Sequence, residues 1–366
     1  MKPDMLRIVI STGGTGGHVF AAVAVAEAFK RAGAEVIVTY PTGDRAEKFL
    51  REEKASERFE LAALPGSSEG RRSGLSAIIA QTRETSRIFR HKPPSALVVV
   101  GGYSVVGPGL AALFTNVPLF VYEQNAVAGR ANRLLSFWAK RILVNLPTHR
   151  LLPSQIVVGH PMRRKLLDAA SSAQSSAGGL KHLLIVGGSQ GARSLDETVA
   201  ALYPLINKRF PNWRVIHLTG PDFMEKAAAA YKAVWGEPMP PDGVFGFRSD
   251  MEALYTTADA AVSRAGAMAS AEIALFAVPA IFVPYPYAAA NHQDANAEYF
   301  GERGAAMVVD EGPCFKERLW GTLIGLLSDD DVRQTLRLRM REASPANDGS
   351  PLVKAVLSAL GLSGRL

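Results

Sequence analysis

The sequence predicts an α/β protein of two doubly wound domains, each with a parallel sheet between layers of helices. Three observations predict this fold. Short apolar runs alternate with helix-length segments along the chain, as they do in parallel sheets with crossover helices. A glycine-rich loop follows the first apolar run of each half. The length of 366 residues fits two domains of about 100–200 residues each.

In the first half, Leu6–Ser11 predicts a strand that leads through a glycine loop into a helix over Val19–Arg31. Gly33 ends this helix, and Glu35–Tyr40 predicts the second strand. Glycines and prolines interrupt the uncharged stretch Pro93–Tyr122, which therefore predicts strand, loop, helix and strand rather than a membrane span. Further strands are expected at Ala96–Val100, Pro118–Glu123, Arg141–Asn145 and Gln155–Val158.

The second half repeats this plan after Ala170–Gly179, a small and polar tract of linker composition. His182–Val186 predicts a strand before the second glycine loop, and Ser350–Leu360 predicts a terminal helix. Further strands are expected at Trp213–Thr219, Asp259–Ser263 and Ala280–Pro284. We expect an N-terminal domain at 1–163, a linker region at 164–179 and a C-terminal domain at 180–345. The last segment, 346–366, is expected to form a helix that packs back on the N-terminal domain.

Composition and charge narrow the class of protein. A lone cysteine, Cys314, excludes a disulfide scaffold. The net charge is +7, but residues 1–160 hold 20 Lys+Arg and 12 Asp+Glu (+8), whereas residues 161–366 hold 21 and 22 (−1). The basic excess therefore lies in the first half. No module of interleaved aromatic and basic residues is present, so we expect no nucleic-acid partner.

Both glycine loops, Gly13–His18 and Gly187–Arg193, stand between a strand and a helix. Glycine lets the backbone approach a ligand, and the start of the helix presents N–H groups to an anion. The first loop is neither a dinucleotide fingerprint, because Val19 replaces its third glycine, nor a P-loop, because no Lys-Ser/Thr follows. Each loop alone also fits a plain tight turn. Together they predict an enzyme with two phosphorylated ligands.

A second cluster of polar residues lies between 263 and 298. Glu272 stands in a helix of small and apolar residues, where a carboxylate suits the two hydroxyls of a ribose; the alternative is a glutamate on a helix surface. Beyond the strand at 280–284, side-chain amides and an imidazole can hydrogen-bond sugar hydroxyls, at Asn291, His292, Gln293 and Asn296. His292 alone fits a solvated loop equally well.

Seven motifs occur in order along nearly the whole chain: GGTGGHVF (13–20), GGY (101–103), YEQNAVAGRAN (122–132), VVGHPMR (157–163), VGGSQGAR (186–193), SRAGAM…AE (263–272) and HQ..NA (292–297). This set resembles the MurG family, the UDP-N-acetylglucosamine:N-acetylmuramyl-(pentapeptide) pyrophosphoryl-undecaprenol N-acetylglucosamine transferases of glycosyltransferase family 28. The resemblance implies a GT-B fold, with two Rossmann-like domains facing across a cleft. It also implies an inverting transfer of N-acetylglucosamine from UDP-N-acetylglucosamine to the 4-hydroxyl of the muramyl sugar of lipid I, forming lipid II in peptidoglycan synthesis.

The same resemblance implies roles for individual residues. Glu272 would hold the ribose diol, Arg248 would offer its backbone to uracil, and Ser189 would face the donor diphosphate. Further family positions that contact the donor or lie beside it are matched by Thr15, Gly16, Gly17, Asn125, Arg163, Ala267, Met268 and Gln293.

The chemistry requires a base for the acceptor hydroxyl. His18 is the leading candidate, with capping or phosphate binding as its alternative role, and Glu123, oriented by Asn125, is its rival. No D-x-D motif of the kind that holds a metal–nucleotide complex stands near a strand end, and we expect neither a catalytic metal nor a cofactor. Departures from the family pattern, at Ala21, His160 and 104–106, concern the acceptor side.

The resemblance places the enzyme at the cytoplasmic face of the inner membrane, as a peripheral protein acting on a lipid-linked acceptor. Between residues 71 and 92, basic residues surround a set of apolar ones. The basic residues are Arg71, Arg72, Arg83, Arg87, Arg90 and Lys92, and the apolar residues are Leu75, Ile78, Ile79, Ile88 and Phe89. This pattern predicts an interfacial helix on anionic lipid, or else an amphipathic helix packed on the sheet.

Other functions stay open on the sequence alone. A diacylglycerol glycosyltransferase or a UDP-sugar epimerase of the GT-B class would share Glu272 and the second glycine loop, but not GGTGGH together with YEQN. A non-catalytic UDP-sugar-binding subunit would be expected to lack one domain or His18, and both are present.

Overall fold

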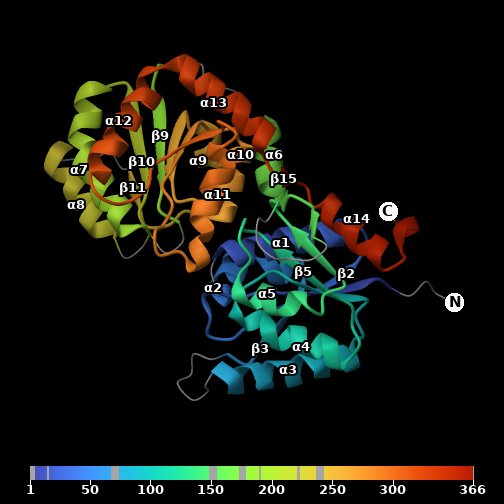
Figure 1. Cartoon of the computed structure of the whole chain (residues 1–366). Helices are drawn as coiled ribbons and strands as arrows, with labels where there is room; N and C mark the ends of the chain where they lie inside the picture. The colour runs from blue at the N-terminus through green and yellow to red at the C-terminus, as the bar shows by residue number, and fades with distance from the viewer. Residues whose placement is uncertain are drawn as a thin grey trace. The chain divides into compact units, whose positions relative to one another are not determined.

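The computed structural model describes residues 5–14, 16–66, 74–147, 155–172, 179–188, 191–220, 223–235 and 243–365 (Figure 1). The chain forms two compact units. Unit 1 comprises residues 1–164 and 346–366, and unit 2 comprises residues 165–345.

Unit 1 is built on a seven-stranded parallel sheet in the order β3-β2-β1-β4-β5-β6-β7. Its central strands are buried along most of their length, which explains their continuous apolar runs. The strands are β1 (Arg7–Ser11), β2 (Glu35–Pro41), β3 (Glu60–Leu64), β4 (Ala96–Val99), β5 (Leu119–Glu123), β6 (Arg141–Val144) and β7 (Gln155–Val157).

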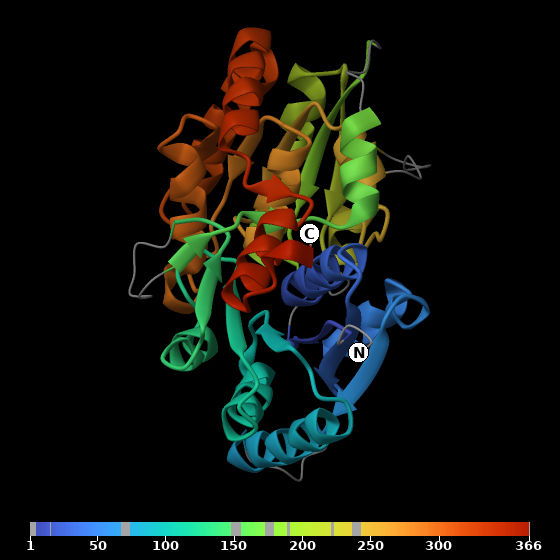
Figure 2. The same ribbon diagram turned by 90° about the vertical axis from the view of Figure 1, so that its right-hand side faces the viewer.

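The helices of unit 1 are α1 (Gly16–Arg31), α2 (Arg45–Glu52), α3 (Gly74–His91), α4 (Val106–Phe114), α5 (Arg130–Ser136) and α14 (Ser350–Ala359). The C-terminal α14 contacts α1 and β6, and Figure 2 shows it in red beside the blue α1. A short pair, β8 (His160–Pro161) with β15 (Ala346–Asn347), ties the returning chain to this unit.

Unit 2 holds a six-stranded parallel sheet in the order β11-β10-β9-β12-β13-β14. Its strands are β9 (Lys181–Val186), β10 (Trp213–Leu218), β11 (Val244–Phe245), β12 (Ala260–Ser263), β13 (Ala280–Phe282) and β14 (Ala306–Val308). Its helices are α6 (Arg164–Ser172), α7 (Arg193–Arg209), α8 (Met224–Trp235), α9 (Met251–Thr257), α10 (Ala267–Leu275), α11 (His292–Gly301), α12 (Phe315–Ser328) and α13 (Asp330–Ala343).

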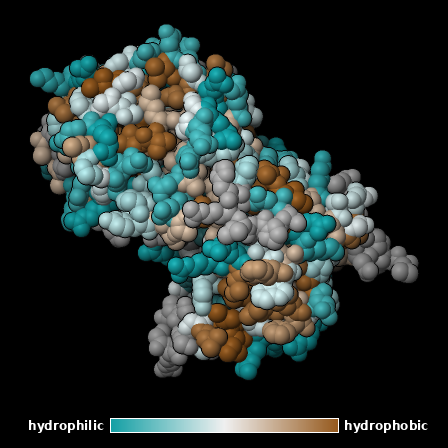
Figure 3. All heavy atoms as spheres, viewed as in Figure 1, coloured by the Kyte–Doolittle hydropathy of each residue, from teal (hydrophilic) through white to brown (hydrophobic). Residues whose placement is uncertain are grey.

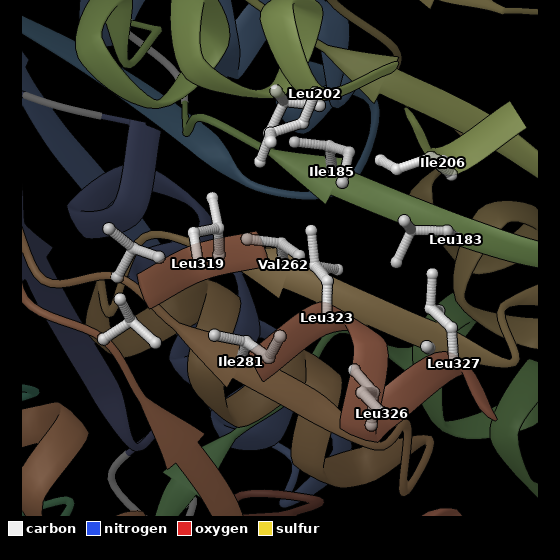
Figure 4. Packing of buried hydrophobic residues seen from close by; sticks show 14 of the residues in the cluster. Leu183, Ile185, Leu202, Ile206, Val262, Ile281, Leu319, Leu323, Leu326 and Leu327 are labelled. Carbon is white, nitrogen blue, oxygen red and sulfur yellow. The ribbon is translucent and has the colours of Figure 1, made fainter. Parts of the chain in front are cut away.

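The core of unit 2 lies between the sheet and two helices, α7 and α12 (Figure 4). In this cluster Ile185 of β9 lies beside Leu202 of α7, and Leu183 lies nearer Ile206 of the same helix. The α12 leucines recur at intervals of three and four residues, so they form one stripe on that helix, at Leu319, Leu323, Leu326 and Leu327. This packing fixes β9 and β12, the two strands that carry the polar loops of this unit.

The structure confirms the predicted α/β fold with two parallel, doubly wound sheets, and each strand expected from the sequence is present within one or two residues. The stretch 93–122 folds as β4, α4 and β5, as expected. The strands β3, β8, β11, β14 and β15 were not predicted, because β3 is an edge strand without a β-branched residue and each of the other four has only two or three residues. Residues 164–172 of the expected linker region are helical, as α6; 173–178 lie outside the described residues.

Within the described part of the chain, no helix combines the length and the apolar character needed to cross a membrane.

His160, which departs from the pattern of the family that the sequence resembles, is fully buried in β8. Its Nδ1 lies 3.2 Å from the carbonyl oxygen of Pro161, and its ring meets Tyr122 edge-on at 6.3 Å. Burial lowers the pKa of His160 to about 4. The folded protein therefore holds this imidazole neutral.

This burial predicts an acid-dependent loss of stability that His160→Asn removes. In the unfolded chain the pKa is 6.5, so the unfolded state binds the proton first as the pH falls. The free energy of unfolding should decrease between pH 6.5 and 4, by about 2 to 3 kcal/mol. Urea unfolding of both proteins at pH 7.5 and 4.5 measures this, and an equal loss in the variant would contradict it.

Candidate functional site

Each sheet reverses its strand order at one point, and the polar motifs lie there. In unit 1 the reversal falls between β1 and β4, which are followed by the loops that begin at Gly13 and Gly101. In unit 2 it falls between β9 and β12, followed by the loops that begin at Gly187 and Arg264. Open parallel sheets bind ligands at the carboxyl ends of their strands at such a point. The structure therefore offers one candidate ligand-binding edge in each unit.

The two glycine motifs of unit 1 touch backbone to backbone. A Cβ on Gly102, whose φ is +87°, would lie 2.6 Å from the carbonyl oxygen of Gly13. A Cβ on Gly13 would lie 1.9 Å from Oγ of Ser104. Side chains at these positions would force the loops apart, so the glycines hold the GGTGG and GGY motifs together.

His18 lies in the first turn of α1 and is half-buried. Its ring covers Gly101, where a Cβ would approach Cδ2 to 2.8 Å and Nε2 to 3.0 Å. The same point lies 3.7 Å from Nδ2 of Asn132. The GGY motif thus provides the flat surface on which the imidazole rests.

Glu123 ends β5 and is buried, with four N–H groups directed at its carboxylate. Oε1 accepts from the backbone N–H of Asn125 at 2.9 Å and from its Nδ2 at 3.1 Å. Oε2 accepts from the backbone N–H of Gly129 and from Nδ2 of Asn132, both at 2.9 Å. These bonds fix the turn that leads into α5. Asn132 connects this network to the surroundings of His18.

Asp44 is a site neighbour that sequence reasoning missed. Its Oδ2 accepts the backbone N–H of Gly14 at 2.9 Å, and its Oδ1 caps α2 through Ala46. The cap has a sequence signal, an aspartate before a helix, but the bond to a loop 30 residues away has none.

Arg163 is almost wholly buried in unit 1. Its Nη1 lies 2.5 Å from Oε1 of Glu53, and its guanidinium stacks on Phe20 of α1 at 4.5 Å. Arg163, which was expected to contact the sugar donor or to lie beside it, therefore lies against α1 with its charge paired to a carboxylate.

In unit 2, Glu272 lies inside α10, as predicted, and only 5% of its surface is exposed. Tyr255 of α9, also buried, donates its hydroxyl to Oε2 of Glu272 at 3.1 Å. Ala267 and Met268 open α10, at the carboxyl edge of the sheet. Tyr255 had not been identified from the sequence, because its link to Glu272 is a tertiary contact between two helices.

Two amides of α11 shape the neighbouring loops. Gln293 accepts the backbone N–H of Tyr285 at 3.0 Å through Oε1. Asn296, buried, donates to the carbonyl oxygen of Ala265 at 2.9 Å. Asn296 thus binds the turn before α10, although the sequence indicated it as a candidate for sugar hydroxyls. Arg248 donates from Nε to Oδ1 of Asp250 at 2.8 Å, and this bond lowers the pKa of Asp250.

Some expected residues lie outside the described part of the chain: Thr15, Arg71, Arg72 and Ser189. Gly16 and Gly17 form the first residues of α1. Within the described residues, no three His, Cys, Asp or Glu side chains are grouped to hold a metal ion.

Comparison with known proteins identifies the family to which the chain belongs. The N-terminal domain model of glycosyltransferase family 28 matches residues 8–144, and its C-terminal domain model matches residues 182–346. The chain belongs to glycosyltransferase family 28. This family 28 enzyme is 33% identical, over 95% of each chain, to a Desulfotalea psychrophila protein named UDP-N-acetylglucosamine--N-acetylmuramyl-(pentapeptide) pyrophosphoryl-undecaprenol N-acetylglucosamine transferase.

Solved structures confirm the GT-B fold of the family 28 enzyme. The crystal structure of MurG from Acinetobacter baumannii matches it with a TM-score of 0.71 and 25% identity, over 99% of this chain and 100% of that chain. UDP-GlcNAc 2-epimerase from Neisseria meningitidis, bound to UDP-GlcNAc, matches with a TM-score of 0.68 over 96% and 100% of the chains. At 11% identity the epimerase shows a shared fold and no more.

Proposed function

We propose that this family 28 enzyme transfers N-acetylglucosamine from UDP-N-acetylglucosamine to the 4-hydroxyl of the muramyl sugar of lipid I, with inversion, forming lipid II. The observation that carries the proposal is the full-length relationship to transferases of that name, at 33% identity. It spans both units, so the acceptor-side and the donor-side motifs are retained together.

Unit 2 is the donor domain in this proposal. Glu272, held by Tyr255, would accept the two ribose hydroxyls. Ala267 and Met268 would lie along the nucleotide, and Gln293 beside the sugar. Ser189 and the glycines around it would receive the diphosphate, and the backbone of Arg248 would face the uracil. Neighbouring N–H groups of the loop suit a leaving diphosphate, because its charge increases during the transfer.

Unit 1 is the acceptor domain, and His18 is the better candidate for its base. Glu123 already accepts four N–H donors, so its lone pairs are directed at its own loop. His18 stands at the open, carboxyl edge of the sheet and is half-buried. An imidazole exchanges protons near neutral pH, as this step requires.

The contact between His18 and Gly101 gives a test. Gly101→Ala places a methyl group 2.8 to 3.0 Å from the imidazole, so the ring must move. Displacing a catalytic group by about 1 Å costs about 100-fold in rate, and we expect kcat to fall by about that factor. Gly33→Ala is the matched control, since Gly33 has a similar φ of +79° and no atom within 4 Å of the added Cβ. Equal kcat values for both variants would contradict the placement.

We also propose that α3 and α5 rest on the cytoplasmic face of the inner membrane. Residues 75, 79, 83, 87 and 90 form one exposed stripe on α3, which is apolar at Leu75 and Ile79 and basic at Arg83, Arg87 and Arg90. Some of the other residues expected at the membrane interface are not exposed to it. Phe89 is buried in the core and Ile88 packs against it, so part of the apolar pattern serves the fold.

The stretch after α5 strengthens this proposal. Phe137 is 79% exposed and Trp138 is 49% exposed. Residues 124–147 contain no carboxylate, and exposed basic side chains surround the aromatic pair, at Arg130, Arg133, Lys140 and Arg141. Hydrophobic surface gathers over this lower part of unit 1, around α3, α4 and α5 (Figure 3). Aromatic and basic side chains together suit the boundary of an anionic lipid surface.

Removal of the aromatic pair tests membrane contact. Phe137→Ser with Trp138→Ser should weaken binding to vesicles of phosphatidylglycerol and phosphatidylethanolamine by at least about tenfold, because burying one such ring contributes about 1.5–3 kcal/mol. Leu338→Ser, a change at a 60% exposed leucine of unit 2, is the control. Co-sedimentation measures both. Unchanged binding of the double variant would refute contact at α5.

The function itself is tested by product formation. The enzyme is incubated with labelled UDP-N-acetylglucosamine and a water-soluble lipid I analogue, and a disaccharide-lipid with an inverted, β-linked sugar is expected. Parallel incubations contain diacylglycerol as acceptor, or no acceptor. Glycosylated diacylglycerol, or conversion of the sugar nucleotide to its 2-epimer without acceptor, would identify one of the alternative GT-B activities. Binding of the nucleotide sugar with no product in any arm would indicate a non-catalytic subunit.

A further inference from the structure

Three polar side chains are buried together behind the second glycine loop, and the chemistry above does not use them. Asp196 of α7 and His217 of β10 have no exposed surface, and Tyr231 of α8 is 4% exposed. Nε2 of His217 lies 2.9 Å from Oδ1 of Asp196, and Nδ1 lies 2.9 Å from the hydroxyl of Tyr231. Burying three such groups is unfavourable unless all are paired, as they are here.

The groups at the two ends of this cluster, the Tyr231 hydroxyl and the Asp196 carboxylate, determine how the hydrogen bonds run. Burial raises the pKa of Tyr231, so its hydroxyl stays protonated and can donate to Nδ1 of His217. Asp196 presents a carboxylate oxygen, which only accepts, so the imidazole donates from Nε2 to Asp196. This gives one ordered chain from Tyr231 through His217 to a carboxylate.

The chain ends at the glycine loop. Oδ2 of Asp196 accepts the backbone N–H of Ala192 at 3.1 Å, the residue before α7 and directly after Gly191. The described ends of the loop also rest on β10. Gly187 donates its N–H to the carbonyl oxygen of Leu218 at 3.0 Å, and a Cβ on Gly191 would lie 2.5 Å from the carbonyl oxygen of Thr219. The end of the strand that carries His217, together with Thr219 directly after it, therefore lies against both described ends of the loop.

We propose that Tyr231, His217 and Asp196 form a positioning relay, which fixes the backbone of Ala192 at the end of the second glycine loop and so supports binding of the diphosphate of the nucleotide sugar. This inference rests on the proposed function, which places the donor diphosphate at that loop. The three are positioning residues, since they act through the backbone of Ala192.

The relay predicts a loss of affinity confined to ligands with a diphosphate. Asp196→Ala removes the acceptor for Ala192, and Tyr231→Phe leaves Nδ1 of His217 without its donor. Each should weaken UDP binding by about threefold to tenfold, the effect of one hydrogen bond. Uridine binding should be unchanged. Calorimetry for UDP and ligand-detected NMR for uridine measure the two affinities.

Conservative variants separate positioning from general damage. Asn at 196 can accept from Ala192 through Oδ1 and donate through Nδ2 to Nε2, with His217 then donating from Nδ1 to Tyr231. Asp196→Asn should therefore restore UDP affinity to within about twofold of wild type. Tyr203→Phe removes a hydroxyl from the ring that meets Tyr231 edge-on, with 4.5 Å between the ring centroids, and should leave UDP affinity unchanged.

The outcomes distinguish failure of the relay from failure of the proposed function. Equal weakening of uridine and UDP in Asp196→Ala and Tyr231→Phe, or no rescue by Asp196→Asn, would overturn the relay. Unaltered UDP affinity in both variants would do the same. Wild-type protein that binds no UDP at all would instead refute the proposed function. Should Asp196→Ala not fold, Tyr231→Phe carries the test, because it keeps the ring and its packing.

Discussion

Replacing His18 with alanine is expected to lower kcat by about 10²–10⁴-fold, the contribution of a positioned general base. The KM for UDP-N-acetylglucosamine should change little, because the proton is removed from the acceptor and only in the transition state. His18 rests on the flat backbone of Gly101 at the carboxyl edge of the unit 1 sheet, the edge at which the proposed function places the acceptor. Steady-state kinetics with a lipid I analogue measure both constants.

Glu123→Gln is the comparison that decides between the two candidate bases. In glutamine, an NH₂ group would face N–H groups that now donate to Glu123, from Asn125, Gly129 or Asn132. We expect a loss of about 1–3 kcal/mol in the free energy of unfolding, together with a smaller loss of turnover than in His18→Ala. Full turnover in His18→Ala would remove His18 from the mechanism. Full stability with lost turnover in Glu123→Gln would assign the base to Glu123.

Local sequence signals predicted most of the fold. The strands were found because buried parallel strands are continuous apolar runs, and the glycine loops were found because positive φ and close backbone contacts select glycine. The strand β3 escaped because an edge strand with the sequence ELAAL has neither alternation nor β-branched residues. The orientation of α3 escaped in part, since an apolar residue such as Phe89 or Leu75 can face the core or the solvent with the same spacing.

In the candidate site, too, local motifs could be recognised from the sequence, whereas contacts between distant residues could not. His18 and Glu272 were each proposed as site residues from the sequence, because in its own motif each is a reactive side chain among small ones. Their partners were not, because tertiary contacts choose them. Tyr255 reaches Glu272 from another helix, and His217 joins Asp196 to Tyr231 from a strand. Spacing along the chain carries no information about such pairs until the sheet order is known.

Replacing Glu272 with alanine is expected to raise the KM for UDP-N-acetylglucosamine by about 100-fold and to change kcat little. A carboxylate that accepts two ribose hydroxyls forms two charge-assisted hydrogen bonds, each of about 1.5–3 kcal/mol. The ribose is remote from the anomeric carbon, so the lost binding is uniform and appears in KM. Donor-saturation kinetics on the wild type and the variant measure this change.

A donor that lacks the ribose 2′-hydroxyl supplies the control. It should bind the wild-type enzyme about tenfold more weakly than UDP-N-acetylglucosamine, and Glu272→Ala should no longer distinguish the two donors. The discrimination between the two donors by Tyr255→Phe should lie between that of the wild type and that of Glu272→Ala. This variant keeps the ring packed on Phe276 at 5.5 Å but removes the hydroxyl that orients the carboxylate. If Glu272→Ala still discriminated against the 2′-deoxy donor, Glu272 would be a structural carboxylate of α10, and ribose recognition would belong to another residue.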